Sequence, residues 1–238
     1  MKAPQMTVAL GRRLTSAQAE RRDQLVQAAR ELATSGGYAA VTISAVCTRA
    51  GVARATFYHY FGSKDHVLGE VLVQWGRERI EELRRHPPTG RSALERVAAT
   101  LRRVMAAVMR DMHLIRAHLQ AVVSPDLGVN ETQRQLASLI AGYVEAGLGS
   151  SDGIDLPALN MLLGHVFFSS LVNMAAGRMT ADQVMDDLTT TATLLLEPAT
   201  APRSRLPGGA RLQAVGKRQT ATLLAPPNPV RTRGRKNA

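Results

Sequence analysis

Apolar residues recur three and four positions apart along most of this chain of 238 residues, a spacing that places them on one face of an α-helix. Leu25, Ala29 and Leu32 show it before the sequence SGGY interrupts the pattern, and no segment alternates convincingly as a β-strand would. The pattern predicts an all-α protein of about nine helices. The expected helices cover residues 17–33, 43–50, 53–60, 64 to the HPPTG break at 86–90, 91–110, 112–122, 128–148, 157–177 and 181–196.

Two of the expected helices are short and flank Gly51. Thr42 is suited to cap the helix over 43–50, and Gly51 stands where a helix commonly ends in a left-handed glycine. The helix over 53–60 follows after a minimal turn. Two such helices with a third packed beneath them form a helix-turn-helix, here about residues 42–61, whose second helix enters the major groove of DNA.

The residue string around this turn is more specific than the helix pattern. The sequence LVQAARELATSGGYAAVTISAVCTRAGVARATFYHYFGSKDHVL resembles the N-terminal domain of the TetR family of transcriptional regulators, in its AA pair, its AGV turn, its TFYxYF run and its SKD. The resemblance covers about residues 20–80. It implies a homodimer that reads a near-palindromic operator and a C-terminal domain that binds a small molecule and releases the DNA. Ala53 departs from the serine or threonine that the family often has there, and it cannot cap the helix.

The helix over 53–60 divides its side chains between the core and DNA. Phe57 and Phe61 share a face and are expected in the core, whereas Arg54 lies on the far side near the helix start. A guanidinium can bond both O6 and N7 of guanine, so Arg54 is the candidate for base readout. The full set of expected DNA contacts, completed by resemblance, is Thr42, Ser44, Arg54, Ala55, Thr56, Tyr58, His59, Tyr60 and Lys64.

Charge and composition suggest four segments. Residues 198–238 carry nine basic and no acidic residues and are rich in Pro and Gly, so a disordered basic tail is expected there. A basic segment of this kind favours polyanionic partners such as DNA. The expected division is a flexible arm over 1–16, the DNA-binding domain over 17–80, a helical effector-binding and dimerisation domain over 81–197, and the tail over 198–238.

The 22 residues from Leu156 to Gly177 contain no charged side chain. Their length would permit a membrane span, but their several polar residues and the lack of a basic flank favour a buried or interface helix. The family resemblance implies that the helices over 157–177 and 181–196 pair with their symmetry mates in a dimer interface. An apolar effector pocket is expected nearby, although its candidate residues could equally be plain core. The candidates are Met105, Met109, Met112, His113, Phe167, Phe168 and Met174.

Several classes of function lack support in the sequence. A single cysteine, Cys47, excludes an intramolecular disulfide framework and is expected as a small buried hydrophobe. His113 and His118 are five residues apart and share no helix face, so no metal site is expected, and no motif indicates a cofactor or an enzyme. Without a signal-like stretch the expected location is the cytoplasm, at the nucleoid when bound to DNA. The alternatives are an activator, a ligand-independent regulator, or a sequence-tolerant DNA-compacting protein.

Overall fold

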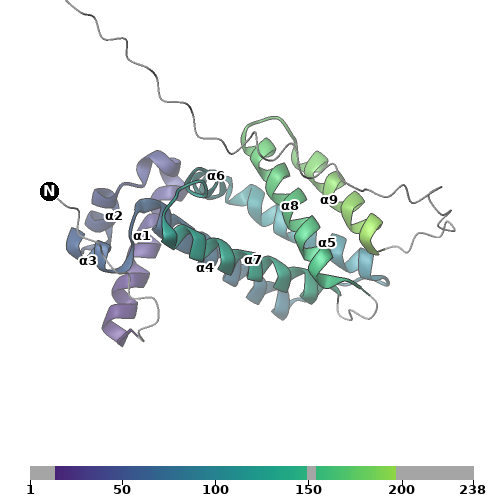
Figure 1. The fold of residues 1–238 in the computed structure, drawn as a ribbon, viewed down its shortest axis with the longest axis horizontal. Coiled ribbons are helices and arrows are strands. Elements are labelled where there is room, and N and C mark those ends of the chain that lie inside the picture. Colours follow the sequence, from purple (N-terminus) through teal and green to yellow (C-terminus); the bar gives the residue numbers. More distant parts are fainter. Residues whose placement is uncertain (1–13, 149–153, 197–238) are drawn as a thin grey trace, which may run out of the picture. The chain divides into compact units, whose positions relative to one another are not determined.

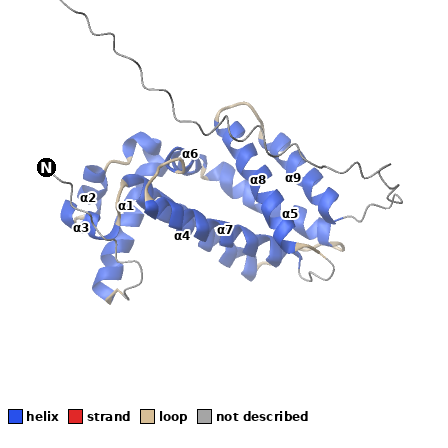
Figure 2. Cartoon of the chain, in the orientation of Figure 1, coloured by secondary structure: helices blue, strands red, loops and turns tan. Residues whose placement is uncertain are grey.

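The structure, a computed structural model, describes residues 14–148 and 154–196. All regular structure in these residues is α-helical, and no strand occurs among them (Figures 1 and 2). The all-α prediction is confirmed, and the nine helices of the described residues match the expected number. They are α1 (Ser16–Ala40), α2 (Ile43–Ala50), α3 (Arg54–Tyr60), α4 (Lys64–Arg85), α5 (Ala93–Arg110), α6 (Met112–Ala121), α7 (Leu127–Leu148), α8 (Leu156–Ala175) and α9 (Ala181–Leu196).

The first helix continues beyond residue 33, where the sequence predicts its end. Gly37 has φ 64° and ψ −161°, which is not helical, and α1 is kinked there. Glycine adopts positive φ without the steric cost that a Cβ would bring. The SGGY signal therefore marks a kink inside α1, and the residues up to Ala40 resume the helix.

The core of the N-terminal half is built on the two phenylalanines of the α3 segment. Phe57 and Phe61 are both 0% exposed, and their ring centroids lie 5.5 Å apart. They join Leu25 and Ala29 of α1 and Leu68 of α4 in one hydrophobic cluster. Burial of a large apolar side chain contributes about 1.5–3 kcal/mol, so these contacts hold the short α3 in place. The prediction that Phe57 and Phe61 are core residues is confirmed.

Helix α4 belongs to both halves of the described chain. It packs against α1 on one side and against α6 and α7 on others. The approach to α7 is very close at Gly69, because a Cβ there would lie 2.2 Å from Thr132 Oγ1. The domain boundary expected at residue 80 falls inside α4, so the two expected domains share this helix. The expected arm over 1–16 and the tail over 198–238 lie almost wholly outside the described residues.

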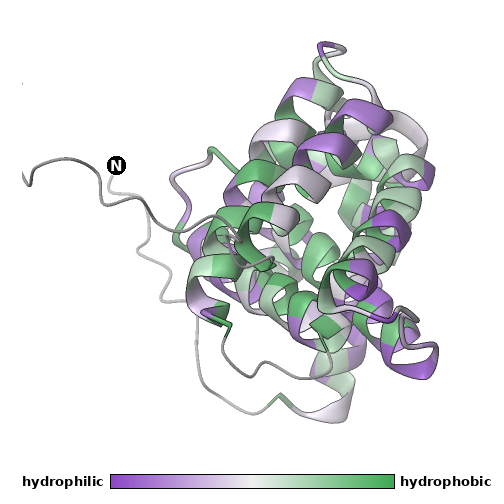
Figure 3. Cartoon of the chain, turned by 90° about the vertical axis from the view of Figure 1, so that its right-hand side faces the viewer, coloured by the Kyte–Doolittle hydropathy of each residue, from purple (hydrophilic) through white to green (hydrophobic). Residues whose placement is uncertain are grey.

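Helix α8 lies beside α9 and is apolar around most of its circumference (Figure 1). Leu159 and Leu163 face inward and are buried, whereas Met161 and Val172 on the opposite face are 54% and 39% exposed. Figure 3 shows hydrophobic and hydrophilic stretches alternating along the ribbons, as amphipathic helices require. By length and composition alone α8 would pass as a membrane span, but it packs against α9, α7 and α6.

Candidate nucleic-acid interface and effector cavity

The turn between α2 and α3 is tight because Gly51 adopts the left-handed conformation, with φ 67° and ψ 30°. The Gly51 amide donates to the Thr48 carbonyl at 3.3 Å, and the Val52 amide donates to the Cys47 carbonyl at 3.1 Å. These bonds satisfy carbonyls that the end of α2 would otherwise leave free. The α2 and α3 segments therefore form the helix-turn-helix that the sequence predicts.

Arg54 stands at the first position of α3 and is exposed. Within residues 14–148 and 154–196 it forms no ion pair and no side-chain hydrogen bond, so its guanidinium is available to a ligand. Ala53 precedes it without a side-chain cap, as the sequence predicts. Most other members of the expected set are also at the surface of α2 and α3. Thr42, Ser44, Ala55, Tyr58 and His59 are exposed, and Thr56 and Lys64 are half-buried.

Two of the expected contacts already have partners within the protein. The Thr42 hydroxyl accepts a hydrogen bond from the Ala45 amide at 3.1 Å, which leaves its proton free to be donated. The Lys64 ammonium lies 3.5 Å from the centroid of the Tyr38 ring, whose hydroxyl donates to Asp65 at 2.8 Å. Lys64 is therefore held at the start of α4, where the helix N-terminus favours an anion.

Tyr60 lies in a different place from the other tyrosine of α3. Its ring is only 9% exposed and belongs to the hydrophobic core, whereas Tyr58 is 38% exposed. The His59 ring packs edge-on against the Tyr60 ring with centroids 4.9 Å apart. The sequence places Tyr60 among the expected DNA contacts, but in the structure its ring belongs to the same hydrophobic cluster as Leu25 of α1 and Leu68 of α4. Tyr60 thus contributes packing, and the exposed polar surface of α3 is carried by its neighbours.

Cys47 is buried in α2, as the sequence predicts. Burial raises the pKa of its thiol, and the nearby Arg54 charge opposes that effect only in part. A raised pKa keeps the group as the unreactive thiol. Cys47 therefore acts as a small apolar side chain beneath the helix-turn-helix.

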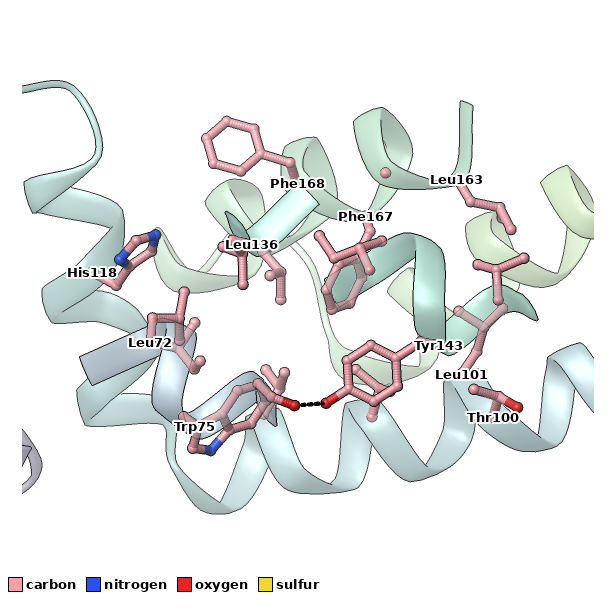
Figure 4. A pocket seen from close by; sticks show the side chains of 18 of the residues that line it. Leu72, Trp75, Thr100, Leu101, His118, Leu136, Tyr143, Leu163, Phe167 and Phe168 are labelled. Carbon is pink, nitrogen blue, oxygen red and sulfur yellow. Dashed lines mark hydrogen bonds between the residues drawn. The ribbon is translucent and has the colours of Figure 1, made fainter. Parts of the chain in front are cut away.

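An apolar cavity of about 110 Å³ lies among α4, α5, α6, α7 and α8 (Figure 4). His118 lies at one end of it, and Thr100 and Leu163 lie at the other. Most polar groups of the wall are bonded within the protein: the Tyr143 hydroxyl donates to the Gly76 carbonyl at 2.7 Å, and the Trp75 Nε1 donates to Asp111 at 2.7 Å. The surface offered to a ligand is therefore almost entirely hydrocarbon.

Two of the seven residues expected to line an effector pocket line this cavity. These are Phe167 and Phe168, both on α8. Met105 and Met174 are packed in the core, Met112 is half-buried against it, and Met109 and His113 are exposed. In place of those five, the cavity wall contains other side chains. They include Leu72, Trp75, Val97, Leu101, Val104, Ile115, His118, Leu119, Gln133, Leu136, Ile140, Tyr143, Leu163 and Leu171.

Comparison with known proteins assigns this arrangement to a family. The family model described as bacterial regulatory proteins of the tetR family matches residues 25–71, and the one described as tetracyclin repressor-like C-terminal domain matches residues 90–195. The HTH-type transcriptional repressor KstR of Rhodococcus jostii (strain RHA1) is 34% identical over 76% of this chain and 85% of its own length. The chain belongs to the TetR family. KstR of Mycobacterium tuberculosis (strain ATCC 25618 / H37Rv) is 30% identical over 76% of this chain and 83% of its own.

Solved structures of TetR-family proteins share the fold. A TetR transcriptional regulator from Rhodococcus sp. RHA1 has a TM-score of 0.68 and 24% identity, and the match covers 78% of this chain and 100% of that one. FadR of Thermus thermophilus, a TetR-family repressor solved with lauroyl-CoA, has a TM-score of 0.61 and 25% identity, over 79% of this chain and 100% of that one. This TetR-family protein is accordingly a DNA-binding transcriptional regulator.

The most distinctive cavity residue of this TetR-family protein was missed by the sequence reasoning. His118 is 4% exposed, and its Nε2 lies 3.3 Å from Gln133 Nε2. Its Nδ1 forms no hydrogen bond of normal geometry within the described residues. The nearby Leu68 backbone raises the pKa of the ring, but by less than burial lowers it. Burial lowers the pKa of His118 from 6.5 to about 4, so the ring is neutral at pH 7. A histidine between apolar neighbours in α6 is the signal that could have indicated it.

The buried His118 predicts a pH dependence of stability. The unfolded chain binds a proton near pH 6.5 and the folded chain only near pH 4, so stability is full above pH 6.5 and is lost as the pH falls towards 4. From pH 7 to pH 5 the free energy of unfolding should fall by about 2 kcal/mol through this residue. Burial also lowers the pKa of His66, which adds in the same direction.

Chemical denaturation at the two pH values checks this. The variant His118→Phe should lose most of the difference, and His113→Phe, at an exposed histidine of the same helix, should keep it. Equal pH dependence in the two variants would assign the effect to other groups.

Proposed function

We propose that this protein is a dimeric repressor that leaves its operator when a small apolar molecule enters the cavity. One observation carries the proposal: α4 lines the cavity through Leu72 and Trp75, and the same helix packs against α1 of the DNA-binding half. A change in the cavity therefore acts through α4 on α1, which packs against α3. The relatives named as KstR repressors support the assignment as a repressor. The FadR repressor solved with lauroyl-CoA supports the binding of an apolar effector.

The proposed dimer forms through α8 and α9. Met161 and Val172 expose apolar side chains on the outer face of α8, Phe168 at the edge of the cavity is 46% exposed, and Leu194 of α9 is 77% exposed. Several large apolar side chains exposed on one pair of helices are typical of an interaction site. Pairing with the same surface of a second copy around a twofold axis buries it, as a symmetric dimer requires.

The size of the cavity explains how an effector could act. An apolar cavity of roughly 150 Å³ can hold benzene, and this cavity is smaller, at about 110 Å³. A ligand as large as an acyl chain must therefore push side chains such as Phe167 outward and shift the helices that carry them. A ligand that binds a second arrangement better than the first moves the equilibrium towards the second by its difference in affinity.

Polar contacts connect α4 to the α5–α6 junction and to α1, which a shift of α4 would move. Trp75 of the cavity wall is bonded to Asp111, which lies at the junction between α5 and α6. Arg30 of α1 forms two hydrogen bonds with Glu78 of α4, at 2.6 and 2.9 Å. Helix α6 also packs on α1. Movement of α4 would in this way change the spacing of the two recognition helices, which fit DNA when they are about 34–36 Å apart.

Selection of bound DNA from a random pool tests the DNA-binding part. The expected product is an inverted repeat whose half-sites lie about 10–10.5 base pairs apart or a multiple of that distance. Recovery of unrelated sequences without symmetry would instead favour a DNA-compacting protein.

The tail over 198–238, outside the described residues, is proposed to add salt-dependent affinity without sequence preference. Truncation after Glu197 should therefore make operator affinity fall less steeply as the salt concentration rises.

Filling the cavity should produce a repressor that no longer responds to its effector. Gly164 lines the cavity from α8, and a Cβ at this position would meet no atom within 4 Å. In Gly164→Leu the new side chain occupies the space that the effector needs, and removal of a helical glycine stabilises α8 by about 0.5–1 kcal/mol. Operator binding should be retained while release by an acyl ligand is lost, measured by DNA-binding anisotropy. Release equal to that of the wild type would show that the effector binds elsewhere.

A further inference from the structure

A second hollow lies directly beside the apolar cavity and has the opposite character. It has a volume of about 280 Å³ and lies between the last turns of α4 and the second half of α5. Three arginines line it: Arg79 from α4, and Arg103 and Arg110 from α5. Among its described lining residues Glu82 is the one acid. We call this hollow the basic pocket.

The three guanidinium groups keep much of their capacity to bond a ligand. Arg79 Nε lies 3.5 Å from Glu82 and forms no hydrogen bond there, although the atom is buried. Arg110 lies 3.7 Å from Asp111, a carboxylate that already accepts from an indole. Arg103 donates to a neutral acceptor, the His86 carbonyl. Arg79 also lies 3.7 Å from Glu78, a carboxylate that already accepts two hydrogen bonds from Arg30. The hydrogen-bond donors of the three arginines are therefore incompletely used.

The basic pocket and the apolar cavity have a common wall. Val104 of α5 and Tyr143 of α7 line both of them. The Arg79 guanidinium also lies 6.0 Å from the centre of the Trp75 ring, and Trp75 lines the cavity. Val104 packs against the cluster that contains Tyr143, so these side chains form the partition between the two hollows. A ligand that displaced them would place a hydrocarbon group on one side and an anionic group on the other.

We propose that the basic pocket binds the phosphate groups of an amphipathic effector whose apolar part occupies the cavity. Three arginines and one glutamate line the pocket, and the two further carboxylates within 4 Å of these arginines, Glu78 and Asp111, are already hydrogen-bonded to Arg30 and Trp75. Three clustered guanidinium groups suit a phosphate or diphosphate better than a single carboxylate. This inference rests on the proposed function, because it names the chemical class of the molecule that releases the DNA. The apolar cavity selects the chain, and the arginines select the phosphorylated head.

Binding of three probes to the full-length protein tests the proposal. Lauroyl-CoA carries an apolar chain and phosphates, laurate carries the chain and one carboxylate, and 1-dodecanol carries the chain alone. Each is titrated against the wild type, Arg103→Gln and Arg110→Gln by calorimetry, with operator release followed by anisotropy. Arg102→Gln is the matched control, since Arg102 is the exposed neighbour of Arg103 and lines neither hollow.

The expected result is that Arg103→Gln and Arg110→Gln each weaken lauroyl-CoA binding by about tenfold or more and reduce its salt dependence. Binding of 1-dodecanol should not change in either variant, and Arg102→Gln should match the wild type. Unchanged lauroyl-CoA binding in both variants, with operator release intact, would overturn the inference and leave the proposed function standing. An equal loss for laurate would overturn the assignment to phosphate. If none of the three probes bound or released DNA, the proposed function would fail as well.

Discussion

Replacement of Val172 by glutamate is expected to separate the dimer and lower operator affinity by roughly 10²- to 10⁴-fold, the gain that linking two binding modules commonly supplies. Val172 lies on the exposed apolar face of α8, 39% exposed in the protomer, so the change should leave the fold of each subunit intact. In the proposed dimer the same position is covered, and an unpaired carboxylate there loses its hydration without gaining a partner. Sedimentation velocity and DNA-binding anisotropy measure the two effects.

The matched control is Val123→Glu. Val123 is also an exposed valine, at 83%, but it follows α6 and lies outside α8 and α9. This variant should remain dimeric and bind the operator like the wild type. A dimeric Val172→Glu protein with full operator affinity would place the interface elsewhere.

Arg54→Ala is expected to lower operator affinity by about 1–3 kcal/mol per half-site, and by about twice that for the dimer on its full operator. Arg54 is exposed at the start of α3 and has no ion pair among the described residues, so its removal should leave the protein's own contacts unchanged. In the proposed role of Arg54, the lost interaction is the one that distinguishes guanine from other bases. Selection of bound DNA by the variant should therefore give a motif with weaker preference at one position of each half-site.

Two controls separate base readout from general attraction to DNA. Lys64→Ala removes a charge that we expect to face phosphate, so it should weaken binding to all sequences alike. Arg84→Ala removes an exposed arginine at the far end of α4 and should change little. If Arg54→Ala lost the same affinity on operator and random DNA, Arg54 would be a phosphate contact and another residue would read the sequence.

The helix-turn-helix could be predicted from the sequence because its determinants are local. Gly51 ends α2, Thr42 begins it, and the spacing of Phe57 and Phe61 identifies the buried side of α3. Each of these signals acts within one or two helical turns. The one residue that behaves differently, Tyr60, lies at the margin of the buried face, where packing against other helices decides the outcome.

The cavity could not be predicted in the same way because five helices contribute to it. Trp75, His118 and Tyr143 are far apart in the sequence, and no periodicity relates their faces. Four methionines were among the candidates for the cavity wall or the plain core, and Met105 and Met174 lie in the core. Phe167 and Phe168 were correctly expected because α8 carries large apolar side chains on most of its circumference; Phe168 lines the cavity although it is 46% exposed. The cavity is a product of how the helices are packed together.

The sharing of α4 by both halves restricts how such a regulator can acquire a new combination of operator and effector. A hybrid joined at residue 80 to the C-terminal part of a relative would keep the close contact between Gly69 and Thr132 only if the incoming α7 carried a side chain of similar shape. Most exchanges of whole segments would therefore give a mismatched helix interface. Substitutions on the outer face of α3 or on the cavity wall leave that interface intact, and new specificities are accordingly easier to reach one residue at a time.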